Sequence, residues 1–195
     1  MNELIQSTKV FQKMETDVSE VFLSKKRIPE QVFLHNWKYY SFDHRLIFSI
    51  EFPYFLIDLS KIFTDITINY MSILPSAVDY YFNNFGFYGA ASFETDRLIN
   101  RYLRVMSRDG NVESFWARGG DVGVFWGSSK KWGIHCDRIS WDLCLMGTSV
   151  DIKESVGFST KFLTFESLKN YVKSQRKADV ATSFMEKLSC NYPTL

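Results

Sequence analysis

The 195-residue sequence contains few cysteines, and they follow no ligand pattern. Cys136, Cys144 and Cys190 make an odd number, with no CxxC motif and no Cys/His quartet at zinc spacing. This usage excludes a disulfide-rich secreted scaffold and is typical of a reducing compartment. We therefore expect a cytoplasmic protein without a metal ion or other cofactor.

Long hydrophobic runs are also missing. The most apolar region, residues 52–74, is interrupted by Asp58, Lys61 and Asp65, which excludes a membrane span. The first residues show no basic segment followed by an apolar stretch, so no secretory signal peptide is expected. The sequence predicts no membrane partner.

Neither sign of charge is in excess, because 23 Lys and Arg residues face 22 Asp and Glu residues. A domain that binds nucleic acid is usually strongly basic, so a net charge of +1 argues against nucleic acid as the partner. Local charged patches are compatible with this overall balance.

The sequence motifs of common chemistries are absent, including GxGxxG, GxxxxGK[ST], HExxH and GxSxG. His135, Cys136 and Asp137 follow one another like parts of a catalytic set. Adjacent side chains of a strand point to opposite faces, so His135 and Cys136 cannot serve one substrate from one strand. A nucleophile that combines His135 with Cys144 of a neighbouring strand stays open, although a free cysteine is more often a small buried hydrophobe. We expect that the protein is not an enzyme.

Aromatic residues are abundant, with 18 Phe, 10 Tyr and 5 Trp. Each buried ring removes roughly 150–250 Å² from water, so the chain can build a large core without disulfides or metal. The length fits one domain, and no linker or repeat divides the chain. We predict that residues 1–195 form a single domain.

The N-terminal quarter is expected to begin with a helix. Apolar residues recur at helical spacing over residues 3–26, with charges on the other side. Residues 31–52 are ambiguous, although the alternation of Leu46, Phe48 and Ile50 with less apolar neighbours suits a strand.

Residues 54–73 fit a helix by the spacing of their apolar side chains and a strand by their β-branched content. We predict a helix here, because the segment is long for a strand. Further helices are expected over residues 76–84 and, with Ser92 as the N-cap, from there to about residue 107.

A different pattern fills residues 112–147. Short segments rich in aromatic and β-branched residues alternate with turn residues, and they cover residues 112–118, 121–126, 131–137 and 141–146. This pattern is typical of an antiparallel meander. Thr164 is then expected to cap a helix from Phe165, with a break near residues 174–179 that leaves two short helices. N-terminal helices, a central antiparallel meander and C-terminal helices together predict an α+β fold.

One side of the predicted helix over residues 92–107 is rich in arginine. Four arginines at spacings of 4, 3 and 4 fall within roughly 60° of helical arc, namely Arg97, Arg101, Arg104 and Arg108. Such a stripe can dock on phosphate or on an acidic protein surface, since arginine suits paired hydrogen bonding. It can equally be a solvated face that Glu94 and Asp96 partly neutralise.

Carboxylates surround the expected hairpin of residues 131–146. Asp137 and Asp142 bracket the connection that contains Arg138, and Asp121 is expected at the neighbouring strand. These groups can hold a divalent metal or face a basic partner. They can also be solvated strand ends that accept hydrogen bonds in the turn.

The same hairpin resembles a known group of proteins. The strand Trp132-Gly133-Ile134, the Asp137-Arg138 turn and the strand that starts at Asp142-Leu143 resemble small bacterial toxin-immunity proteins, including those paired with contact-dependent inhibition toxins. The helix start at residues 165–168 is similar too. The resemblance implies a cytoplasmic protein that binds and blocks one cognate toxin domain, often a nuclease. It assigns no binding residue.

Our leading hypothesis is an immunity-type protein that sterically neutralises a cognate protein toxin without chemistry. The candidate binding residues are Asp121, Asp137, Arg138 and Asp142 at the hairpin, with the arginines at positions 97, 101, 104 and 108 as the rival surface. Two other classes stay open: a small Cys/His or metal-dependent enzyme, and an RNA-binding module that uses the arginine-rich helix.

Overall fold

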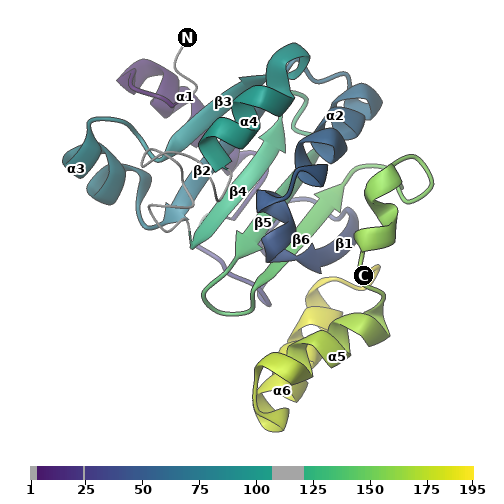
Figure 1. The fold of residues 1–195 in the computed structure, drawn as a ribbon. Coiled ribbons are helices and arrows are strands. Elements are labelled where there is room, and N and C mark those ends of the chain that lie inside the picture. Colours follow the sequence, from purple (N-terminus) through teal and green to yellow (C-terminus); the bar gives the residue numbers. More distant parts are fainter. Residues whose placement is uncertain (1–3, 24, 107–120) are drawn as a thin grey trace.

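A six-stranded antiparallel sheet organises the computed structural model, which describes residues 4–23, 25–106 and 121–195 (Figure 1). The strand order is β1-β6-β5-β4-β2-β3, and every neighbouring pair is antiparallel. The strands are β1 (Lys38–Asp43), β2 (Thr67–Leu74), β3 (Ala90–Glu94), β4 (Val122–Gly127), β5 (Trp132–Asp137) and β6 (Leu143–Thr148). The α+β class predicted from the sequence is confirmed.

The predicted meander forms the centre of this sheet. The segments 121–126, 131–137 and 141–146 correspond to β4, β5 and β6, whereas the first predicted strand, residues 112–118, lies outside the described residues. Every residue of these three strands is buried. Gly133 in β5 allows close packing, because a Cβ there would lie 2.5 Å from the ring of Phe22.

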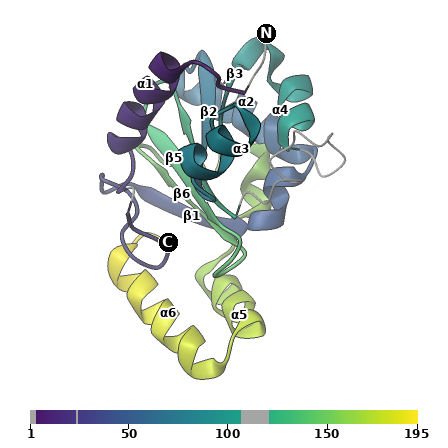
Figure 2. The same ribbon diagram turned by 90° about the vertical axis from the view of Figure 1, so that its left-hand side faces the viewer.

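Helices cover both faces of the sheet (Figure 2). On one face, α2 (Glu51–Phe63) and α4 (Leu98–Met106) pack with two 3₁₀-helices, His44–Phe48 and Gly157–Lys161. On the other face lie α1 (Thr8–Ser19), α5 (Phe165–Gln175) and α6 (Ala178–Asn191). Each face therefore has its own hydrophobic core. No helix in the described part of the chain is long and apolar enough to cross a membrane.

The predicted N-terminal helix is too long, because α1 begins only at Thr8, with Ser7 as the N-cap, and ends at Ser19. Two apolar residues that the spacing assigns to the helix form strand-like pairs instead. Leu4 forms a β-bridge to Ala91, and Phe22 forms one to Phe33.

The predicted helix over residues 54–73 is half wrong. The structure ends α2 at Phe63 through Thr64, whose φ of 56° lies in the left-handed region, and β2 starts at Thr67. The β-branched residues of the second half favour a strand, and pairing with β3 and β4 stabilises it. The expected alternating strand at residues 46–50 is also wrong, because His44–Phe48 is a 3₁₀-helix and the strand precedes it.

The helix predicted from Ser92 starts late. Ser92 lies in β3 opposite Asn69, to which its hydroxyl donates a hydrogen bond of 2.8 Å, and α4 begins at Leu98 after a 3₁₀ turn. The other helix predictions are confirmed. A π-helix, Ala77–Phe82, follows the Ser76 cap and continues into α3 (Asn83–Phe85). Thr164 caps α5, and the chain breaks between α5 and α6.

Asp65 ties the α2–β2 connection to the meander. Its side chain is buried and accepts hydrogen bonds from the Trp132 indole N–H at 2.7 Å and from the Ser129 backbone N–H at 2.5 Å. Both donors belong to the β4–β5 hairpin region, so the Asp65 carboxylate links the segment before β2 to that hairpin.

Replacing Asp65 tests this role. We expect Asp65→Ala to lower the free energy of unfolding by about 3 kcal/mol, because the Trp132 indole, the Ser129 N–H and the Ser128 hydroxyl lose their carboxylate acceptor. Asp65→Asn keeps one acceptor oxygen and should cost less. Urea unfolding followed by tryptophan fluorescence measures both. Asp58→Ala, which removes a carboxylate paired with Lys61 on α2, is the control. Equal stabilities for the Asp65 and Asp58 alanine variants would contradict the assignment.

Candidate functional site

The turn of residues 137–142, between β5 and β6, holds several of the predicted binding residues. Asp137 is fully buried there. It accepts a hydrogen bond of 3.0 Å from the Arg27 guanidinium and one of 2.8 Å from the Ser140 backbone N–H. Its carboxylate is therefore an internal acceptor that fixes the turn.

Asp121 and Arg138 form an ion pair with each other, in which Arg138 Nε lies 3.0 Å from Asp121 Oδ1. Their backbones are also joined, since the Arg138 N–H donates to the Asp121 carbonyl at 2.8 Å. The Asp121 N–H in turn donates to the Leu74 carbonyl at 3.0 Å. The structure thus brings two predicted site residues together and places them beside the end of β2.

Asp142 ends the turn with a φ of 51°. Its carbonyl accepts hydrogen bonds from the His44 backbone N–H at 3.0 Å and from the Tyr171 hydroxyl at 2.8 Å. Partial burial raises the pKa of the Asp142 carboxyl, and the nearby charge of Asp43 adds to the effect. The four predicted hairpin residues are therefore engaged within the chain by ion pairs or backbone contacts.

Two histidines close to this turn are buried and neutral. Burial lowers the pKa of His44 to about 3, and the positive charge of Arg138 adds to the effect. Burial also lowers the pKa of His135 to about 4, although Asp137 acts in the opposite direction. His44 Nδ1 lies 3.8 Å from Asp142 Oδ1, which is too long for a hydrogen bond.

The cysteines of the meander face away from His135. Cys136 and Cys144 are cross-strand partners, and the Cys144 thiol donates to Cys136 Sγ at 2.8 Å. Both side chains belong to the core beneath α2 and α4, whereas His135 lies opposite Val124 and Leu145 on the other face. Burial raises the pKa of the Cys144 thiol, and the hydrogen bond to Cys136 adds to this effect. This geometry does not assemble the nucleophile that the sequence left open.

The predicted arginine stripe is divided by the late start of α4. Arg97 lies in the 3₁₀ turn and pairs with Asp96, and Arg101 in α4 pairs with Glu94 at 3.2 Å. Arg104 is exposed in the last turn of α4, and Arg108 lies outside the described residues. The part of the chain that the structure describes holds no group of three His, Cys, Asp or Glu side chains arranged to bind a metal ion.

A surface that the sequence did not predict lies on the β2–β3 connection. Four large apolar side chains, from the last residue of β2 to the end of α3, are each 36–41% exposed, and we call them the aromatic patch: Leu74, Val78, Tyr80 and Phe85. The Tyr80 and Phe85 rings are adjacent, with centroids 5.7 Å apart. Residues 80–88 contain six aromatic side chains, more than one helix face can bury, and this density was the available sequence signal.

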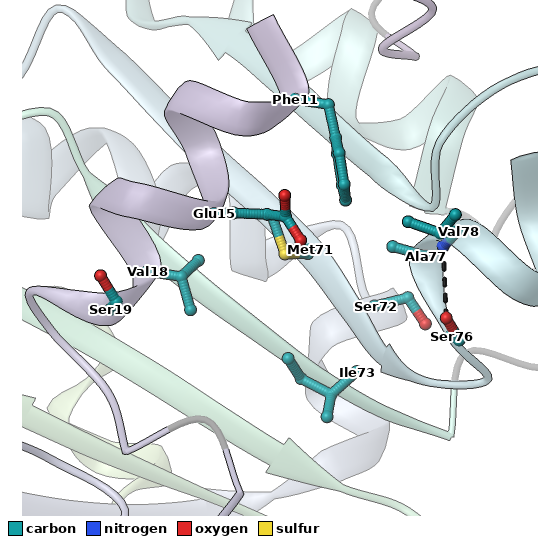
Figure 3. A pocket seen from close by; sticks show the side chains of 10 residues that line it. All are labelled: Phe11, Glu15, Val18, Ser19, Met71, Ser72, Ile73, Ser76, Ala77 and Val78. Carbon is teal, nitrogen blue, oxygen red and sulfur yellow. Dashed lines mark hydrogen bonds between the residues drawn. The ribbon is translucent and has the colours of Figure 1, made fainter. Parts of the chain in front are cut away.

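A groove lies between α1 and the π-helix, and Val78 of the aromatic patch is one of its lining residues (Figure 3). Its volume is about 250 Å³. Apolar side chains from both helical segments and from β2 line it, namely Phe11, Val18, Met71, Ile73, Ala77 and Val78. Glu15 reaches into the space from α1, and Ser19, Ser72 and Ser76 complete the lining.

Comparison with known proteins supplies no template for these surfaces. The chain matches no protein-family model, no curated protein and no solved structure.

The neutral histidines predict how stability depends on pH. Their pKa values are lower in the folded protein than the ordinary 6.5, so the unfolded chain binds protons more readily below that pH. As the pH is lowered from about 6 to about 4, the free energy of unfolding should therefore decrease, by up to about 1.4 kcal/mol per pH unit for each histidine. Guanidinium unfolding at several pH values measures this slope. His44→Gln and His135→Gln should each remove about half of it, and an unchanged slope in the double variant would contradict the assignment.

The buried thiols predict a simple labelling pattern. Cys190 is exposed, whereas Cys136 and Cys144 are buried. Ellman's reagent should therefore modify one thiol rapidly in the native protein and all three in denaturant. Cys190→Ser should abolish the rapid reaction. A rapid reaction that remains in Cys190→Ser would show that the sheet thiols are accessible.

Proposed function

We propose that this protein is a non-catalytic, immunity-type binder that neutralises a cognate protein toxin by covering part of the toxin surface. The aromatic patch is the observation that carries the proposal. Exposed apolar patches on folded domains commonly mark interaction sites, and tyrosine is enriched among residues that dominate binding energy.

The surroundings of the aromatic patch suit a protein interface. Leu74 at its edge is hydrogen-bonded through its carbonyl to Asp121, whose carboxylate pairs with Arg138. An apolar centre beside a polar, charged border is the usual composition of a binding surface. Two of the hairpin residues considered from the sequence thus fall at the rim of the patch.

The inward placement of the reactive side chains supports binding rather than chemistry. Cys136 and Cys144 lie in one core, and His135 faces the other. A Cys–His nucleophile needs the thiol and the imidazole within hydrogen-bond reach of each other and of a substrate. The resemblance of residues 132–147 to toxin-immunity proteins supplies the class of partner.

The function is tested by capture followed by an inhibition assay. Tagged protein is used to capture partners from a native lysate at high salt, and a stoichiometric partner is identified by mass spectrometry. The partner's toxicity to growing cells is then measured with and without the chain. We expect a one-to-one complex and loss of toxicity, which a Cys136→Ala/Cys144→Ala variant should preserve.

Two variants locate the interface. Tyr80→Ala and Phe85→Ala should each weaken the complex by about 30-fold, as expected for residues that dominate binding. Tyr54→Ala is the matched control, because Tyr54 is an exposed aromatic residue on α2. Undiminished toxicity in the presence of excess chain would overturn the function. Equal losses in the Tyr54 and Tyr80 variants would overturn the location.

A further inference from the structure

Aromatic stacking and hydrogen bonds fix the two helical segments that form the groove between α1 and the π-helix. Tyr88 stacks on Phe11 of α1 with ring centroids 4.1 Å apart, and on Phe82 of the π-helix with centroids 4.4 Å apart. The Tyr88 hydroxyl also lies 2.9 Å from the Thr8 hydroxyl. Ser76 caps the π-helix by accepting a hydrogen bond from the Asp79 N–H at 3.1 Å. A pre-formed groove avoids the entropic cost of ordering its walls when a partner binds.

The size of the groove suits one protruding side chain. Pockets for drug-sized ligands usually enclose roughly 300–1,000 Å³, whereas this groove encloses about 250 Å³ and is open to solvent. Its apolar lining of Val18, Met71 and Ile73 offers contact to an aliphatic chain. A single side chain that protrudes from a protein surface therefore fits the groove better than a metabolite does.

The charge of the groove is one-sided. Glu15 lines it, Asp79 follows the lining residue Val78 in the sequence, and no Lys or Arg is among its lining residues. Both acidic side chains are exposed, and neither forms an ion pair within the described ranges. The lysines of α1, at positions 9 and 13, lie roughly 120–160° around the helix from Glu15, on its other side.

These features specify the chemistry of the occupant. We propose that the groove receives an arginine or lysine side chain from a basic surface of the partner protein, and this inference rests on the proposed function. The aliphatic stem would lie on the apolar floor while the cationic head meets Glu15. An apolar side chain would desolvate the Glu15 carboxylate without pairing with it, and an acidic side chain would be repelled.

A basic side chain as the occupant of the groove restricts the partner to proteins that present a basic face. A protein domain that handles nucleic acid presents lysine and arginine to the phosphate backbone. A groove that accepts one such side chain, beside an aromatic patch that contacts its surroundings, suits a toxin with a basic face of this kind.

A chemical probe tests the groove without the partner. N-acetyl-arginine methylamide is titrated into ¹⁵N-labelled full-length protein, and N-acetyl-citrulline methylamide, which is isosteric and neutral, is the matched ligand control. We expect the arginine probe to shift the backbone amide signals of Glu15, Ser19 and Val78, and the citrulline probe to shift them far less. Glu15→Gln should lower the affinity for the arginine probe by about tenfold. Glu154 is an exposed residue in the connection that follows β6, and Glu154→Gln should leave this affinity unchanged.

The outcomes separate this inference from the proposed function. Absent shifts, equal shifts from both probes, or unchanged binding in Glu15→Gln would each overturn the groove assignment, whether or not a toxin partner exists. Failure to find or inhibit a partner would overturn the proposed function and leave the probe result standing. With the captured toxin, Glu15→Gln should raise the dissociation constant by about tenfold, and an unchanged constant would overturn the docking role.

Discussion

The burial of the central strands on both faces is the constraint on which the rest of the structure depends. All residues of β4, β5 and β6 are buried, so two apolar layers must cover them. The chain meets this need with rings from helices on both sides, including Phe52 and Phe55 from α2 and Phe184 from α6. Because these strands are interior, the polar side chains that they carry become interior groups too. His135 is neutral for that reason.

The central part of the fold could be predicted from the sequence, whereas the segments beside it could not. Strands in the meander are short, β-branched and separated by turn residues, so local pattern and final structure agree. In residues 54–73, apolar side chains keep helical spacing through Ile66 and Tyr70 although the backbone changes to a strand after Thr64. Spacing alone cannot show that change, because pairing with β4 supplies the stabilisation.

The candidate site was hard to predict for a related reason. Carboxylates of the 137–142 turn are visible in the sequence, but their partners are distant, since Arg27 precedes Asp137 by 110 positions. The predicted arginine stripe requires one unbroken helix, but Arg97 lies in the 3₁₀ turn that precedes α4. The sequence predicts the helix around Tyr80. It does not predict which of its side chains are exposed, because that depends on how the β2–β3 connection projects from the sheet.

The balance of charge has a consequence for recognition. A net charge of +1 gives little long-range attraction toward any highly charged partner, so discrimination has to arise at short range. In the proposed complex, the aromatic patch would supply contact area, but it would accept many apolar surfaces. Glu15 would restrict that tolerance in the proposed complex, because a partner without a basic side chain at the groove would leave its carboxylate desolvated and unpaired. In the proposed complex, the patch would thus supply affinity and one acidic side chain would supply selectivity, both beside the part of β2 that ends at Leu74.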